Sequence, residues 1–129
     1  MEIKTHGKIS QMLVGIPLEV VDGVRAVAEL TAINEMAADF TGLVHGGFTF
    51  SLADYVAMLA VNHPNVVLGQ AQVKFTAPIR VGDTMKAEAI VTKREGRKSE
   101  VNVVVKVGDK NVFTGLFSCY TLDKHVLDK

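Results

Sequence analysis

The sequence predicts an α+β fold in which an antiparallel sheet of five to six strands curls around one long central helix. Two observations indicate it. Residues 46–62 form an apolar stretch with helical spacing, and segments in which apolar and polar residues alternate stand before and after it. Because a typical domain has roughly 100–150 residues, we expect the chain to fold as a single domain spanning residues 1–129.

The part of the chain before the central helix predicts one short helix and two strands. The short helix is expected within residues 1–14. Strands are expected at 17–21 and 24–32, joined by Asp22-Gly23, a pair that tolerates the backbone angles of a tight hairpin. Residues 34–45 then form a loop that leads into the central helix.

The central helix is expected from Gly46 to Asn62. Its large apolar residues recur at helical spacing: Phe48, Leu52, Tyr55 and Leu59. His63-Pro64 ends it, because proline cannot donate the next backbone hydrogen bond. Asp54 is the only formally charged side chain in this helix, so a carboxylate in apolar surroundings is expected there.

Strands follow the helix in succession. Period-two alternation marks them at 70–77, 85–91 and 101–107, and a last strand covers 112–122. The turns between them contain Gly82, Gly96 and Gly108. Such a sheet covers only one side of the helix, and its edge strands are unpaired. We therefore expect a homodimer, or a tetramer built as a dimer of dimers.

Composition excludes several classes of partner. Fourteen basic and fourteen acidic side chains cancel, which leaves no electrostatic footprint for nucleic acid or for an anionic membrane. No window approaches the ~20 apolar residues of a membrane-spanning helix, and the N-terminus lacks the apolar core of a signal peptide. We expect a cytoplasmic protein with Cys119 packed as a small hydrophobe and with no metal site.

The central helix offers the two groups that hydrolysis of a thioester needs, donors for the developing oxyanion and a base or nucleophile. Gly46 and Gly47 allow a ligand oxygen to approach the unpaired N–H groups of the first helical turn. Asp54 has no cation within one helical turn, so desolvation is expected to raise its pKa and suit it to proton transfer. It lies roughly 12 Å from Gly46 along the axis, which a second subunit could bridge.

Other residues have two interpretations each. Asp39 is either a turn or cap former or an acid that acts on substrate. His45 either fixes the loop by a hydrogen bond or transfers protons. Phe48 either lines an acyl tunnel or belongs to the core. Arg97 and Lys98 either end a solvated hairpin or pair with phosphate groups of a substrate, which in a thioesterase would be those of coenzyme A.

The pattern His45-Gly-Gly-Phe48 followed by Ser51-Leu-Ala-Asp54 resembles the hotdog-fold acyl-CoA thioesterases of the phenylacetate-pathway type. Residues 73–78 and 81–83 add weaker similarity, and the resemblance covers the chain from about 15 to 122. It implies that Asp54 is the nucleophile or general base. It also implies that the Gly46 N–H polarises the thioester carbonyl, and that two subunits build each site.

The resemblance leaves open which acid acts. Another branch of the fold has its catalytic aspartate in the loop before the helix, in a pattern Asp-x-x-Gly-x-Val that residues 39–44 also satisfy. Enzymes of the phenylacetate type usually have asparagine at the position of Asp39. Some members also present a hydroxyl from the next strand, where this chain has Leu68; Gln70 or Thr76 would then have to take over that role.

The function implied is hydrolysis of an acyl-CoA thioester to free acid and CoA. No metal or redox cofactor is implied, and coenzyme A enters only as part of the substrate. A non-catalytic acyl-CoA-binding or regulatory protein is the alternative, because hotdog domains also serve as ligand domains of lipid-synthesis repressors. A hydratase or dehydratase is a weaker third hypothesis.

Overall fold

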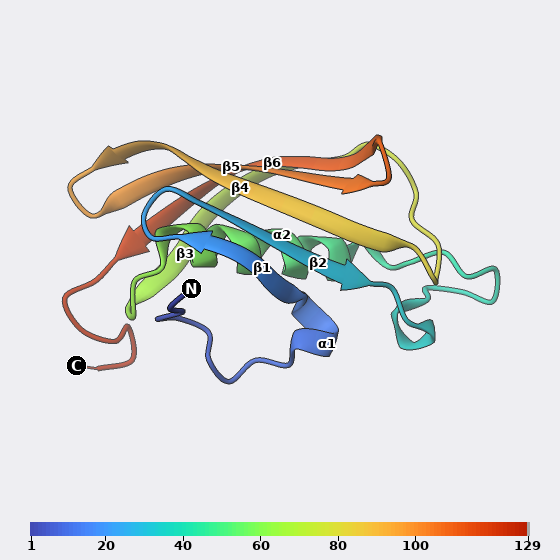
Figure 1. Ribbon diagram of the computed structural model, residues 1–129, viewed down its shortest axis with the longest axis horizontal. Helices are drawn as coiled ribbons and strands as arrows, with labels where there is room; N and C mark the ends of the chain where they lie inside the picture. The colour runs from blue at the N-terminus through green and yellow to red at the C-terminus, as the bar shows by residue number, and fades with distance from the viewer. Residues whose placement is uncertain (129) are drawn as a thin grey trace.

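A computed structural model describes residues 1–128 and contains one six-stranded antiparallel sheet packed on one long helix (Figure 1). The strand order is β1-β2-β4-β5-β6-β3. This confirms the predicted α+β architecture of the hotdog fold. The elements are α1 (Gln11–Val14), β1 (Ile16–Val21), β2 (Arg25–Thr31), the 3₁₀ helix η1 (Asn34–Met36), α2 (Gly46–Val61), β3 (Val66–Phe75), β4 (Thr84–Glu95), β5 (Lys98–Val107) and β6 (Lys110–Thr121).

The face of the sheet that the alternating pattern predicted as apolar is the face that covers α2. The buried apolar residues of β4 and β5 are Met85, Ala87, Ala89, Val101, Val103 and Val105, and those of α2 include Leu52, Ala53, Val56, Ala57, Leu59 and Ala60. Alanines on both surfaces allow the helix axis to lie close to the strands. The burial of one face fixes the register of the strands, because a shift of one residue would expose the whole apolar set.

Helix α2 ends as the sequence predicts. Asn62 adopts the left-handed conformation (φ 53°) and its N–H donates to the Met58 carbonyl at 2.8 Å. The Asn62 side chain also binds the N-terminal segment: it accepts from the Lys4 N–H and donates to the Glu2 carbonyl, both at 2.8 Å. The N-terminal segment therefore contacts the C-terminal end of α2, which the sheet alone would leave less covered.

Strand β3 begins earlier than the alternation at 70–77 predicts. Val66 to Leu68 pair with the end of β6, and the ladder shifts by one residue between Leu68 and Gln70. Gly69 occupies the shift, and a Cβ there would lie 2.4 Å from Cε2 of the Tyr120 ring. β3 is the last strand of the sheet, so one side of its backbone has no partner strand among residues 1–128.

The loop at 34–45 is held firmly against residues 79–81. Its cross-links are Val44 N–H to the Ile79 carbonyl (2.8 Å) and Val81 N–H to the Gly42 carbonyl (2.9 Å). The His45 N–H also donates to the Met36 carbonyl at 2.9 Å. These bonds place the start of α2 at the end of the molecule where β4 begins (Figure 1).

Candidate active site

The N-terminus of α2 presents free backbone donors. Phe48 N–H donates to the His45 carbonyl at 3.1 Å, whereas the N–H groups of Gly46 and Gly47 have no hydrogen-bond partner among the described residues. A Cβ on Gly46 would lie 3.0 Å from Cε1 of Phe75, whose ring packs beside this end of the helix. The two N–H groups are therefore available to donate to an oxygen atom of a ligand.

A surface groove of about 410 Å³ opens beside these donors. It lies between the start of α2 and the segment that leaves β3. Its lining residues are small or apolar and none is charged: Val44, Gly46, Thr49, Phe75, Thr76, Ala77, Pro78 and Ile79. A volume of this size is in the range of small-molecule sites.

Asp54 lies two turns further along α2 and is only partly exposed. Its Oδ1 atom is buried and has no hydrogen-bond partner among the described residues. Burial raises the pKa of Asp54 to about 6. An unsatisfied carboxylate oxygen in apolar surroundings is unfavourable for stability, so a role in chemistry or binding is the more economical explanation for this acid.

A partly exposed stripe connects Asp54 with the start of the helix. Gly47, Ser51 and Asp54 follow the i, i+4, i+7 spacing of one helical face, and none of them is fully buried. The Ser51 hydroxyl donates to the Gly47 carbonyl at 2.9 Å and so lies along this stripe. Because Gly46 and Asp54 belong to one straight helix, roughly 12 Å of axis separates them, and one chain does not bring them together.

Asp39 lies in the exposed loop before α2, where it forms a turn. Its Oδ1 accepts hydrogen bonds from the Thr41 N–H at 2.9 Å and the Thr41 hydroxyl at 2.6 Å. These bonds, the hydroxyl first, hold the pKa of Asp39 below its usual value. The turn carries Phe40, whose side chain is fully exposed. In the isolated chain, Asp39 therefore has the hydrogen bonds of a turn-forming residue, one of the two interpretations of its role.

His45 and Phe48 flank the glycine pair. The imidazole of His45 is exposed, has no hydrogen bond among the described residues, and meets the Phe48 ring edge-on at a centroid distance of 6.3 Å. The hydrogen bond that fixes this loop therefore comes from the His45 backbone. Phe48 is partly buried and packs against the core.

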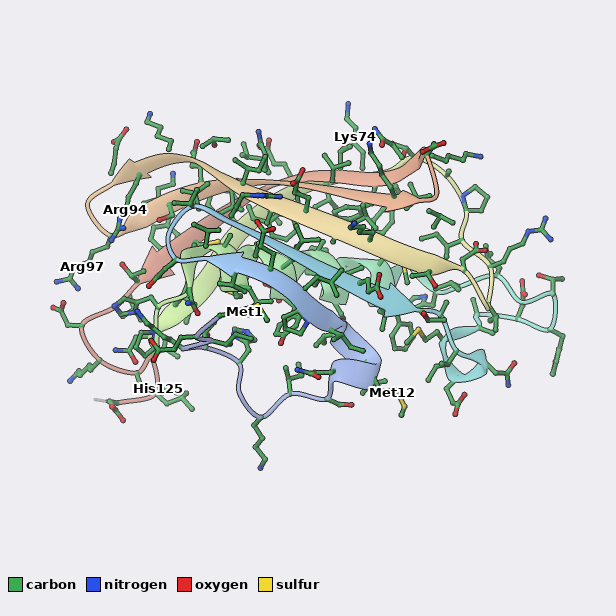
Figure 2. The ribbon with its side chains drawn as sticks, in the orientation of Figure 1. Met1, Met12, Lys74, Arg94, Arg97 and His125 are labelled. Atoms are coloured by element: carbon green, nitrogen blue, oxygen red, sulfur yellow. The ribbon has the colours of Figure 1, made fainter. Side chains whose placement is uncertain are left out.

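Arg97 and Lys98 lie at the opposite end of the molecule. The twelve residues of β4 separate the start of α2 from the β4–β5 turn, which corresponds to roughly 36 Å. Figure 2 shows Arg94 and Arg97 at this far turn. Arg97 pairs with Asp123 at 2.5 Å and Lys98 with Glu100 at 3.8 Å. Within one chain these cations therefore do not approach Gly46.

The residues considered in connection with a supporting hydroxyl or amide lie on β3 or directly after it. Leu68 pairs with Cys119 in the ladder, and Gln70 pairs with Ser118 on the opposite face of the sheet. The Thr76 hydroxyl donates to the Asn111 carbonyl at 3.0 Å. Among the described residues, no cluster of three or more His, Cys, Asp or Glu side chains could hold a metal ion, and no helix is long and apolar enough to cross a membrane.

The sequence did not single out Phe75 as part of the site. It appeared only as one apolar residue of an alternating strand. The one feature of the sequence that could have indicated a role for Phe75 is its position at the end of a strand, directly before Thr76-Ala77-Pro78. Only the fold shows that this strand end lies against the first turn of α2.

Comparison with solved structures shows the same fold in proteins from several organisms. An uncharacterized protein, PH1136 from Pyrococcus horikoshii, is 52% identical with a TM-score of 0.96, over 99% of this chain and 98% of that chain. The phenylacetic acid degradation protein PaaI from Thermus thermophilus is 25% identical with a TM-score of 0.78, over 85% of this chain and 95% of that chain.

Two curated relatives are longer than this chain. A methylthioribose-1-phosphate isomerase from Aquifex aeolicus (strain VF5) is 48% identical over 124 residues, which are 95% of this chain but 27% of that protein. Transcription factor FapR from Thermoanaerobacter sp. (strain X514) is 32% identical over 117 residues, 91% of this chain and 58% of that protein. The similarity thus concerns only part of each relative.

Residues 41–114 match the family described as Thioesterase superfamily. This range contains the glycine pair, the whole of α2 with Asp54, and the groove segment at 75–79. More than half of the chain is matched, and the six-stranded sheet around one helix agrees with it. The chain therefore belongs to the Thioesterase superfamily.

Proposed function

We propose that the protein hydrolyses an acyl-CoA thioester to the free acid and CoA, with Asp54 as the catalytic carboxylate. One observation carries the proposal. Asp54 is a largely buried acid with an unpartnered oxygen and a raised pKa, on the helix face that leads to two free N–H groups. Membership of the superfamily supports thioester chemistry. Similarity to PaaI and the pattern at 45–54 favour the phenylacetate-pathway type.

The reaction needs an electrophile and a base. The Gly46 N–H donates to the thioester oxygen and stabilises the negative charge that forms there, aided by the positive end of the α2 dipole. Asp54 takes a proton from water, and the resulting hydroxide adds to the carbonyl carbon. The carbon–sulfur bond then breaks and the proton passes to the leaving thiolate. Direct attack by Asp54, followed by hydrolysis of the anhydride, uses the same groups.

A second subunit completes the site in this proposal. Roughly 12 Å of helix separates Gly46 from Asp54 in one chain, which is too far for both to contact one carbonyl group. The free edge of β3, the exposed stripe of α2 and the exposed Phe40 offer surface for a second copy. We therefore assign each site to Gly46 of one subunit and Asp54 of the other, in a homodimer that can pair further into a tetramer.

Asp54 is a better base than Asp39. The Asp39 carboxylate already accepts two hydrogen bonds from Thr41 and has a lowered pKa, so it binds a proton weakly. We assign Asp39 a positioning role: it holds the turn that carries Phe40 and leads to Gly46. His45 and Gly47 then shape the helix start, and Phe48 supports it from the core.

Arg97 and Lys98 are proposed to bind CoA phosphates supplied across the dimer. Each has one ion pair at the protein surface, with Asp123 and Glu100. Exposed ion pairs of this kind contribute roughly 0–1 kcal/mol to stability, so replacing the carboxylate by a phosphate group costs little free energy. The far end of one chain approaches the start of α2 in another only if the two chains are antiparallel.

A non-catalytic acyl-CoA-binding or regulatory role is the second candidate. It is favoured by the 32% identity with transcription factor FapR over 91% of this chain. Tight binding of an acyl-CoA without turnover would select it over the hydrolase.

Steady-state hydrolysis of a panel of acyl-CoAs tests the proposal. Wild type, Asp54→Asn and Asp39→Ala are compared with thiol detection. We expect turnover by the wild type, loss of at least about 100-fold in Asp54→Asn, and a smaller loss in Asp39→Ala. Equal activity of the wild type and Asp54→Asn would refute the assigned role of Asp54.

A further inference from the structure

The ring of Phe75 forms one wall of the groove at the start of α2. Its Cε1, Cδ1 and Cζ atoms would lie 3.0, 3.4 and 3.5 Å from a Cβ on Gly46. The ring is fixed from behind by Phe113, edge-on at a centroid distance of 5.1 Å. Even so, 56% of the residue is exposed, so the ring is a rigid apolar surface that faces outward beside the free Gly46 N–H.

The other side chains of the groove offer no free hydrogen-bond donor. Thr49 and Thr76 carry its only side-chain hydroxyls, since the remaining lining residues are glycine or apolar. The Thr49 hydroxyl contacts the Met85 sulfur at 3.6 Å, and the Thr76 hydroxyl donates to the Asn111 carbonyl at 3.0 Å. No lining residue is charged. The groove therefore combines an apolar lining with backbone donors at its inner end.

We propose that this groove binds the acyl group of the thioester and selects acyl groups without a terminal charge, with Phe75 as the specificity-determining residue. The proposal rests on the proposed function and adds a substrate class to it. The carbonyl oxygen of the thioester accepts a hydrogen bond from the Gly46 N–H, and a hydrocarbon chain packs against the apolar lining residues. A terminal carboxylate loses water there and finds no free side-chain donor.

Phe75 also limits the width of the acyl group. Since the ring takes up the space that a side chain at position 46 would fill, a ligand carbonyl that binds the Gly46 N–H lies beside the ring in this proposal. A narrow chain fits in that position. Removal of the ring opens the wall and weakens the discrimination between narrow and branched chains next to the carbonyl.

The test compares four acyl-CoAs that differ in charge and width: butyryl-CoA, 2-methylbutyryl-CoA, 3-hydroxybutyryl-CoA and succinyl-CoA. Hydrolysis is measured for wild type, Phe75→Leu, Phe75→Ala and the control Ile90→Ala, an exposed apolar residue of β4. Binding of the same four compounds is measured by calorimetry with Asp54→Asn, which is expected to bind without turning over substrate.

We expect wild type to prefer butyryl-CoA to succinyl-CoA by about 10-fold or more in kcat/KM, and to discriminate less against 3-hydroxybutyryl-CoA, whose hydroxyl can donate to a threonine oxygen of the groove. Phe75→Ala should raise the KM for butyryl-CoA about 10-fold, with a smaller change in kcat, and reduce the preference over 2-methylbutyryl-CoA. Phe75→Leu should retain part of the preference. Ile90→Ala should behave as wild type.

Equal kcat/KM values, or equal affinities, for butyryl-CoA and succinyl-CoA overturn the inference. So does an unchanged ranking in Phe75→Ala. These results are distinct from failure of the proposed function, which is absence of turnover by the wild type. If the wild type binds but does not turn over the compounds, the ranking of affinities still decides the inference. If none of the four binds, both are wrong.

Discussion

The charge of Asp54 on α2 acts on the thiol of Cys119 on β6, a strand that packs against this helix. Burial, and then the negative charge of Asp54, raise the pKa of Cys119 to about 12. The thiol is fully buried and stays protonated, as expected for a packed small hydrophobe. The acid therefore has an uncharged neighbour, and nothing among the described residues offsets its desolvation.

The first prediction concerns stability. The folded-state pKa of Asp54 is about 6, above the ordinary value of 3.8, so the folded chain binds a proton that the unfolded chain releases between these values. Ionised Asp54 therefore destabilises the fold above about pH 6, and this penalty disappears as the pH falls through 6 towards 4. Asp54→Asn should raise the free energy of unfolding at pH 8 by on the order of 2 kcal/mol.

Urea unfolding of wild type and Asp54→Asn at pH 4 and pH 8 measures this effect. The two stabilities should differ at pH 8 and converge at pH 4. Asp109→Asn, in the exposed β5–β6 turn, serves as a control and should follow the wild type. A difference between wild type and Asp54→Asn that does not depend on pH would show that the asparagine acts by packing alone.

The second prediction is the pH dependence of catalysis. A base must be deprotonated, so kcat/KM should decrease as the pH falls through about 6, the pKa of Asp54. Stopped-assay rates between pH 4.5 and 8.5 record the profile. Asp39→Ala should retain the inflection at a lower rate. If the inflection disappears in Asp39→Ala, the loop acid is the base and the roles are reversed.

The third prediction separates positioning by Asp39 from proton transfer. Asparagine at this position can accept the same hydrogen bonds from the Thr41 N–H and hydroxyl. Asp39→Asn should therefore keep activity within about threefold of the wild type, whereas Asp39→Ala loses the turn and about 10-fold in kcat/KM. A loss in Asp39→Asn as large as in Asp54→Asn would contradict a positioning role.

The fourth prediction concerns the irregularity in β3. Gly69→Ala places a Cβ 2.4 Å from the Tyr120 ring, so the ring must move and stability should fall by about 1–3 kcal/mol. Thermal unfolding followed by circular dichroism checks it. Gly7→Ala is the matched control, because a Cβ at Gly7 has no neighbour within 4 Å. Equal melting temperatures for both variants would mean that Tyr120 moves at no cost.

The sequence predicted those elements whose one buried face imposes a pattern. The alternation in β4 and β5 and the apolar spacing in α2 identified these elements, because a single helix buries against a single sheet face. The first residues of β3 were missed, since Gly69 breaks the alternation at the ladder shift. The hydrogen bonds from Asn62 to Glu2 and Lys4 join residues about sixty positions apart, and no local sequence pattern predicts them.

The candidate site was predictable only in part. Asp54 and Gly46 stand out because a lone acid and a glycine pair are unusual in an apolar helix. Phe75 was not identified, because its contact with Gly46 depends on where β3 ends in space. The position of Arg97 far from Gly46 likewise follows from the length of β4 and not from any property of the turn itself.

The central claim is that two subunits build each site, and mixed dimers test it most directly. Asp54→Asn removes the base, and Gly46→Pro removes the N–H donor at the first helical position, where proline is tolerated. Gly46→Ala keeps the N–H but blocks the space beside Phe75, and it is the second choice if Gly46→Pro does not fold. Each variant alone should be inactive. If each site is shared between subunits, a mixed dimer formed by subunit exchange contains one intact site and one site with both changes.

Random exchange of equal amounts makes half of the dimers mixed, so activity should return to about a quarter of the wild-type level. Recovery to that level, measured as thiol release from butyryl-CoA after co-expression of differently tagged chains, is the result that this account predicts. If Asp54 and Gly46 act within one chain, no dimer contains an intact site. Absence of any recovery in verified mixed dimers would therefore contradict the account.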